Sequence, residues 1–363
     1  MRFREKIRWA GKILFPICAW RLPEQVIFFI TDKCNLACAH CFYWANLNKE
    51  TNEATLEEID RFSKSLGPFS FLTLTGGEPF LRDDIPEIIK IFNKNNFVSN
   101  VSIPTNGFFT ERILRTAENI LTNTKNVNLA VKISLEGLEE KHDAIRGARG
   151  AFLKAVDTYH GLVKLKKTNP YFKVGIIITY SALNQEDLPE TLDYIEEKLN
   201  PDMISLSFAR GNVRDPKIKE ADVANYLKLY RRVLSFLLAK KNKQTNLYYR
   251  FYSAYKSKVS EMVAQTANQN RYLFPCYAGK LLCIIDSSLN VYPCEIIGRG
   301  FGSIRARGYD FRKLWFSRDA ELLRKEIKDT RCCCTYECSL QISTFFNLKA
   351  LLSLVPRMLW LNY

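Results

Sequence analysis

Between residues 26 and 208, short apolar or β-branched runs alternate with segments whose apolar residues recur at helical spacing. The runs predict strands at residues 26–31, 71–75, 98–103, 129–134, 174–180 and 203–208. The helical spacing predicts helices at residues 55–66, 85–95, 110–121, 151–167 and 187–199. Strands separated by helices pair in parallel, because parallel neighbours need a crossover connection. The pattern therefore predicts an α/β fold, either an open doubly wound sheet or a full or partial barrel.

The pattern changes after about residue 216. Residues 219–265 predict two helices, and residues 281–293 contain two apolar runs around a turn, which predicts a hairpin. The last twenty residues are strongly apolar, with only Lys349 and Arg357 charged. The expected division is a basic N-terminal segment at 1–21, a barrel at 22–216, a helical connector at 217–270, a cysteine-rich domain at 271–342 and an apolar tail at 343–363.

Polar and glycine-rich residues follow the predicted strands at their carboxyl ends, where parallel α/β folds gather their active-site residues. Cysteines follow the first strand, residues 75–79 the second, residues 104–107 the third and residues 134–137 the fourth. Arg210, which follows the sixth strand, is either directed at a substrate or solvated. This placement predicts one site at one end of the sheet.

Three cysteines, Cys34, Cys38 and Cys41, follow the first strand at C-x3-C-x2-C spacing. Three thiolates on a short loop can hold three irons of a cubane cluster and leave the fourth iron open to a small molecule. A composition with 11 cysteines would give such a triplet by chance only about 0.01 times. A structural zinc site would need His40 as its fourth ligand, in a poor position beside Cys41. A disulfide framework fits small secreted chains better than a chain of this length.

The triplet resembles the signature of the radical S-adenosylmethionine (SAM) superfamily, and the resemblance covers about residues 22–340. It implies a partial, TIM-like (β/α)6 barrel with a [4Fe–4S] cluster on the three cysteines. It also implies reductive cleavage of SAM to a 5′-deoxyadenosyl radical, which abstracts hydrogen from a substrate. An external electron donor such as flavodoxin or ferredoxin is implied as a partner. The substrate is left open between a peptide or protein and a small or lipid-linked molecule.

Two further motifs resemble SAM-binding signatures of this superfamily. Gly76-Gly77-Glu78-Pro79 resembles the Gly-Gly-Glu-Pro turn, which implies backbone contact with the amino group of SAM. Residues 134–137, with His142-Asp143 and Arg146-Gly147, resemble a signature of the SPASM branch, although Glu136 stands where Asp is common. The resemblance implies that Ser134 and Arg146 help to hold SAM. The expected cofactor-binding residues are His40, Gly76, Gly77, Glu78, Pro79, Asn106, Ser134 and Arg146.

The second cysteine group resembles a SPASM or Twitch extension and implies one auxiliary [4Fe–4S] cluster. Its expected ligands are Cys276, Cys294 and Cys338 with either Cys332 or Cys334. Structural zinc is the alternative for this group. Cys283 lies within a predicted strand and is expected in the core. Glu295, directly after Cys294, is a candidate general base, because a carboxylate in a dry site can acquire a suitable pKa.

The formal net charge is +15, but the basic residues are dispersed, so nucleic acid is not the expected partner. Two alternatives remain open: a zinc- or Fe–S-stabilised scaffold that binds an anionic partner, and a radical SAM enzyme that modifies RNA. The cysteine pattern predicts reduced thiols and a cytoplasmic protein, and neither a signal peptide nor a spanning helix is predicted. The basic N-terminus and the apolar tail suggest peripheral contact with a membrane.

Overall fold

The computed structural model describes residues 22–124, 126–167, 169–240 and 247–360. Within these residues, nine strands form one sheet in the order β6-β5-β4-β3-β2-β1-β7-β8-β9. The six strands from β1 to β6 pair in parallel in chain order, as expected from the alternating pattern. They are β1 (Gln25–Thr31), β2 (Phe71–Gly76), β3 (Asn100–Thr105), β4 (Asn128–Ser134), β5 (Phe172–Tyr180) and β6 (Met203–Phe208).

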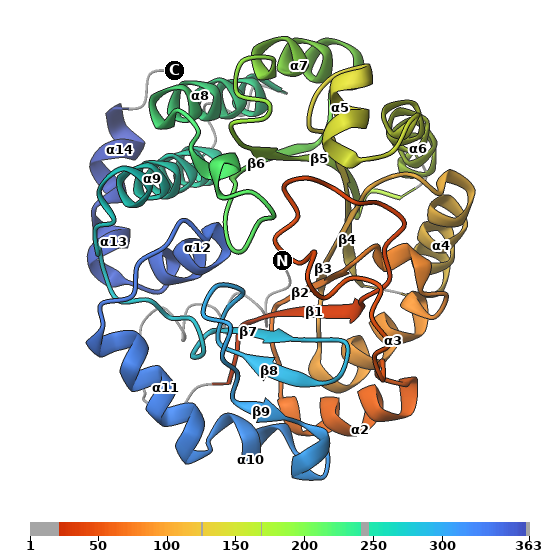
Figure 1. The fold of residues 1–363 in the computed structure, drawn as a ribbon, viewed down its shortest axis with the longest axis vertical. Coiled ribbons are helices and arrows are strands. Elements are labelled where there is room, and N and C mark those ends of the chain that lie inside the picture. Colours follow the sequence, from red (N-terminus) through yellow and green to blue (C-terminus); the bar gives the residue numbers. More distant parts are fainter. Residues whose placement is uncertain (1–21, 125, 168, 241–246, 361–363) are drawn as a thin grey trace.

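Helices follow these strands and line the outer side of the curved sheet (Figure 1). They are α2 (Leu56–Leu66), α3 (Ile85–Asn96), α4 (Thr110–Asn123), α5 (Glu139–Arg146), α6 (Ala151–Lys166) and α7 (Leu188–Tyr194). Local sequence sets their ends: Thr55 and Glu58 form a capping box at the start of α2, for example. The short helix α5, whose polar sequence has little apolar periodicity, was not predicted.

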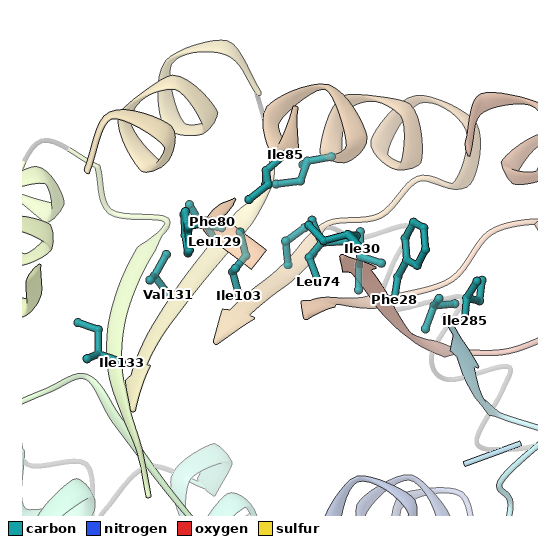
Figure 2. Packing of buried hydrophobic residues seen from close by; sticks show 14 of the residues in the cluster. Phe28, Ile30, Leu74, Phe80, Ile85, Ile103, Leu129, Val131, Ile133 and Ile285 are labelled. Atoms are coloured by element: carbon teal, nitrogen blue, oxygen red, sulfur yellow. The ribbon is translucent and has the colours of Figure 1, made fainter. Parts of the chain in front are cut away.

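Strands β2–β6 have an apolar face toward the helices and a mostly polar face toward the inside of the curve, whereas β1 also buries Ile27 and Phe29 on its inner face. Leu74, Ile103 and Val131 are buried between the sheet and the helices (Figure 2). Their neighbours on the opposite face, such as Ser102 and Ser134, are small, polar and half-buried. Because the helices α2–α7 cover one face only, the fold is a partial barrel with a polar lumen, and the doubly wound alternative is wrong.

The second part of the chain continues the same sheet. Strand β7 (Leu282–Ile285) pairs in parallel with β1, and β8 (Asn290–Tyr292) returns antiparallel to it. The expected hairpin is therefore confirmed. The remaining elements are α8 (Val223–Ala239), α9 (Leu247–Gln269), β9 (Gly302–Ser303), α10 (Phe311–Trp315), α11 (Arg318–Asp329), α12 (Glu337–Phe345), α13 (Leu348–Leu352) and α14 (Leu354–Trp360).

The described part of the apolar tail folds back on the molecule. Arg357 of α14 forms two hydrogen bonds of 2.7 Å with Glu261 of α9. No single helix among the described residues is long and apolar enough to cross a membrane; residues 337–345 and 348–358 qualify only as a pair, which is bent by 84°. The predicted basic segment, residues 1–21, lies outside the described residues. The proposed division of the chain into domains stays a prediction.

Candidate functional site

The loop that carries the first three cysteines is held at both of its ends. Asn48 pairs with the backbone of Cys34 through two hydrogen bonds of 2.9 Å, one to its N–H and one to its carbonyl. Asp32, just after β1, accepts hydrogen bonds from Tyr43 at 2.7 Å and from Ser287 at 2.5 Å. In the middle of the loop, the Ala39 N–H donates to the carbonyl of Ile145 in α5. These contacts place the cysteines at the carboxyl end of the barrel.

The donor set of this loop fits an iron–sulfur cluster. Burial raises the pKa of the Cys34 thiol to about 11, and burial also raises the pKa of Cys41. Buried thiols with raised pKa values need a strong electropositive partner to act as thiolates, and iron is such a partner. Among the described residues, no group of three or more His, Cys, Asp or Glu side chains is placed to hold a single metal ion.

The turn after β2 fits against the cysteine loop. The N–H groups of Gly77 and Glu78 donate to the carbonyls of Thr31 and Lys33 at 2.9 and 2.8 Å. A Cβ on Gly76 would lie 2.1 Å from the Thr31 oxygen, and one on Gly77 would lie 2.1 Å from the Lys33 oxygen. The two glycines therefore permit a close approach that any side chain would prevent.

Glu78 joins the carboxyl ends of β2 and β3. Its carboxylate accepts hydrogen bonds from the Thr105 hydroxyl and the Asn106 N–H, both at 2.8 Å. Burial raises the pKa of Glu78 to about 7, although these hydrogen bonds oppose the rise. The Asn106 side chain in turn donates to the Asn35 side chain of the cysteine loop at 2.9 Å. Glu78 and Asn106 thus shape the site from the protein side, and their contact with a cofactor stays a prediction.

Glu136 and Arg146 form a buried ion pair beside the cysteine loop. The Arg146 Nη2–Glu136 Oε1 distance is 2.8 Å, and Arg146 Nη1 lies 3.4 Å from Cys38 Sγ. Among the residues that the structure describes, Arg146 Nε is buried and has no hydrogen-bond partner, and an N–H of this kind suits a carboxylate. Ser134, at the end of β4, is half-buried on the lumen face. The expected roles of Ser134 and Arg146 toward SAM are compatible with this arrangement and stay predictions.

The two histidines near this pair are neutral. Burial, with Arg146 as the second cause, lowers the pKa of His40 to about 3 and that of His142 to about 2. His142 Nδ1 accepts a hydrogen bond from the Glu136 N–H at 3.0 Å, and His40 Nε2 lies 3.7 Å from Glu136 Oε1. His142 therefore packs against the site, and His40 is close enough to line it.

The second cysteine group gathers beside the β7–β8 hairpin. Cys276, Cys332, Cys333 and Cys334 line one small pocket. Cys294 is 6% exposed, and burial is the largest cause that raises the pKa of its thiol. The charges of Cys276 and Cys332 raise this pKa further. Cys338 is in a different electrostatic environment: burial raises the pKa of its thiol, and among the charges Glu295 raises that pKa most while Arg210 lowers it. Cys283 in β7 is fully buried and belongs to the core, as expected.

Arg210 connects the two cysteine groups. Its guanidinium donates to Glu295 at 3.0 Å and lies over the rings of Phe42 and Tyr336, at 5.3 and 4.9 Å from their centroids. Phe42 follows Cys41, and Glu295 follows Cys294. The solvated alternative for Arg210 is therefore wrong, because the side chain is in a mostly buried ion pair. The contacts of Arg210 depend on the tertiary structure. The sequence signals them only by placing Arg210 at the end of a strand.

Two of the site's supporting residues had no sequence signal. Asn48 lies fourteen positions after its partner Cys34, in a stretch without periodicity. Tyr336 is fully buried, and its ring lies against the guanidinium of Arg210. Only the folded chain brings these side chains to the cysteines.

Comparison with known proteins places this site in a family. Residues 28–195 match the sequence model of the radical SAM superfamily. The chain is 27% identical to the AdoMet-dependent heme synthase of Methanosarcina barkeri over 84% of both chains. It is 31% identical to the Fe-coproporphyrin III synthase of the same organism, over 48% of this chain and only 42% of that relative.

Solved structures have the same fold at low sequence identity. The structure of anSMEcpe with bound AdoMet and the Cp18Cys peptide matches with a TM-score of 0.57 and 17% identity, over 87% of this chain and 85% of that one. Streptococcus suis SuiB bound to S-adenosylmethionine matches with a TM-score of 0.58 and 17% identity, over 88% of this chain and 72% of that one. The family match of residues 28–195, together with the cysteine loop and the Gly-Gly-Glu-Pro turn inside that range, shows that this part of the chain is a radical SAM domain.

Proposed function

We propose that this enzyme binds SAM at a [4Fe–4S] cluster on Cys34, Cys38 and Cys41 and modifies a substrate held in the barrel lumen. The bound cluster would supply one electron to SAM, giving methionine and a 5′-deoxyadenosyl radical that takes a hydrogen atom from the substrate. That electron comes from an external one-electron donor such as flavodoxin or ferredoxin. The observation that carries the proposal is the cysteine loop, held against the Gly76–Gly77 turn with Arg146 beside Cys38.

The residues around the cluster bind and orient SAM. Arg146 has an unpartnered Nε and a planar donor group, which suits a carboxylate. The turn at Gly76 and Gly77 offers backbone carbonyls, the acceptors that an ammonium group requires. Ser134 and His40 line the same end of the barrel. Phe42 and Trp44, which follow Cys41 in the same loop, pack on Arg210 and Arg214.

We also propose an auxiliary [4Fe–4S] cluster on the second cysteine group. Cys276 and Cys294 flank the hairpin, and the remaining ligands come from Cys332, Cys334 and Cys338. The proposal is supported by the pocket that Cys276, Cys332 and Cys334 share. If the second cysteine group holds zinc and no iron, the radical chemistry at the first group is unaffected and the second site is structural.

Glu295 is the proposed general base toward the substrate. Its side chain is 6% exposed, and Arg210 holds one carboxylate oxygen at 3.0 Å. The pair lies between the two cysteine groups, so a substrate there would be within reach of both. Two relatives from Bacillus subtilis support a peptide substrate: one is named as the maturation protein of the sporulation killing factor, and the other as a biosynthesis protein of the bacteriocin subtilosin. The heme synthase relative supports a small molecule instead.

The test is anaerobic reconstitution with iron and sulfide, followed by dithionite and SAM. The expected result is about eight irons per chain, as for two cubanes, and formation of 5′-deoxyadenosine detected by mass spectrometry. The control is Cys34→Ala, which should lose about four irons and all SAM cleavage. Zinc without iron, and no 5′-deoxyadenosine from the wild-type protein, would contradict the proposal.

Location in the cytoplasm and peripheral contact with a membrane stay predictions. The tail packs on α9, yet Leu348, Leu352 and Val355 are 57%, 61% and 52% exposed. Flotation with anionic liposomes at low salt measures such contact directly.

A further inference from the structure

A buried pair of opposite charges lies against one sulfur of the cysteine loop. The side chains of Arg146 and Glu136 are 8% and 2% exposed, and Arg146 Nη1 lies 3.4 Å from Cys38 Sγ. Charges in such a place are screened little by solvent, so they act on the sulfur more strongly than surface charges do. Arg146 touches the sulfur, while Glu136 lies behind Arg146.

Glu136 is fixed in place by three neighbouring segments. Its Oε2 accepts a hydrogen bond of 2.7 Å from the Thr179 N–H in β5. Its backbone N–H donates to His142 Nδ1 at 3.0 Å, and its carbonyl accepts from the Asn184 side chain at 2.9 Å. The carboxylate therefore has a defined position from which its Oε1 orients the guanidinium of Arg146. The variant E136D would keep the negative charge on a side chain that is one methylene group shorter.

We propose that Glu136 is a positioning residue that holds Arg146 against Cys38 and thereby sets the reduction potential of the first cluster. The inference rests on the proposed function, because it concerns the cluster that the three cysteines would hold. Charge and hydrogen bonds to cluster sulfurs tune the potentials of iron–sulfur proteins. Reduction adds negative charge, so Arg146 raises the potential, and Glu136 partly cancels that effect.

The two charges therefore have opposite effects when they are removed. Glu136→Gln keeps the shape of the side chain and one acceptor oxygen, which can still face Arg146, but it gives up the hydrogen bond from the Thr179 N–H and leaves Arg146 without its counter-charge, so the potential becomes more positive. Arg146→Met removes the cation and the contact with the sulfur, so the potential becomes more negative. A purely structural role for Glu136 would produce no such pair of opposite shifts.

The experiment is a potentiometric titration of the reconstituted full chain, followed by electron paramagnetic resonance. The signal of the first cluster is identified by its change when SAM is added. The variants are E136Q, R146M, E136D and, as a matched control, D202N. Asp202 forms an ion pair with Lys166 near the start of β6, away from the cysteine loop. R146K, which keeps the charge without the planar donor group, is the second Arg146 variant in case R146M does not fold.

We expect E136Q to raise the potential and R146M to lower it, each by at least a tenfold change in the reduction equilibrium, about 59 mV for one electron. D202N should match the wild-type protein. E136D keeps the charge but withdraws the carboxylate from Arg146, so it should shift the potential less than E136Q does, and R146K should shift it less than R146M. Shifts of the same sign in E136Q and R146M, or no shift in E136Q, would overturn the inference. A wild-type chain that holds no iron on the first three cysteines would refute the proposed function instead.

Discussion

Replacing Gly77 with Ala tests whether the turn after β2 positions the cysteine loop. The φ angle of Gly77 lies outside the left-handed region, so Ala brings no backbone strain of that kind. Its Cβ would instead lie 2.1 Å from the Lys33 oxygen, 2.6 Å from the Lys33 carbonyl carbon and 3.0 Å from Cys34 Cβ. Ordinary contact needs at least 3.4 Å. Either the loop moves by more than 1 Å at its start, beside Cys34, or the new Cβ stays overpacked against it.

The expected cost follows from the contacts that this movement breaks. The hydrogen bonds from Gly77 to Thr31 and from Glu78 to Lys33 are 2.9 and 2.8 Å long. Losing both costs about 1–3 kcal/mol, at about 0.5–1.5 kcal/mol each. If the loop stays in place, the overpacking itself costs about 1–3 kcal/mol. Either way, we expect the free energy of unfolding of the metal-free protein to fall by about 1–3 kcal/mol.

The assay is urea denaturation of the metal-free protein, followed by an iron count after reconstitution. Gly77→Ala should lower the denaturation midpoint and lose iron from the first cluster. The control is Gly150→Ala, where a new Cβ meets nothing within 4 Å but φ is +80°. This control should cost about 1–2 kcal/mol of backbone strain yet keep its iron. A Gly77→Ala protein with wild-type stability and iron content would refute the reasoning.

Three further predictions test other contacts. Cys276→Ala should lose the iron of the second cysteine group, whereas Cys283→Ala, which changes a buried core thiol, should keep it; equal iron losses in both variants would contradict the ligand assignment. Arg210→Met should destabilise the chain by about 3–5 kcal/mol in urea, because it leaves Glu295 buried and unpaired, and Arg210→Met combined with Glu295→Gln should recover part of that loss. Arg305 and other hydrogen bonds lower the pKa of Glu58 to about 2. The charged Glu58 therefore stabilises the fold above pH 4.5, and this stabilisation is lost as the pH falls toward 2. Because the pair is partly exposed and screened by solvent, Glu58→Gln should lower the free energy of unfolding by about 0.5–1 kcal/mol at pH 7. That difference should shrink on acidification, and a difference that grows would contradict the sign.

The local pattern of the chain predicted most of the barrel. The six parallel strands and the helices between them follow from alternating apolar runs, because a buried strand or helix needs its own periodicity. The first three cysteines were predicted as ligands because their spacing is local, within eight residues. The hairpin beside Cys276 and the burial of Cys283 were also predicted from short-range pattern.

Features that depend on contacts between residues far apart in the sequence were decided only by the tertiary structure. Periodicity did not distinguish a barrel from an open sheet, because either fold buries the same apolar faces; the helices on one side of the sheet made the difference. The pairing of β7 with β1 joins residues more than 250 positions apart. In the sequence, Glu136 is only a small departure from a motif. In the folded chain it pairs with Arg146, which contacts Cys38. Folding likewise brought Arg210 and Glu295 together in an ion pair. Sequence alone thus determined most of the elements and predicted the cysteine ligands, while the electrostatics around them depend on distances that only the folded chain establishes.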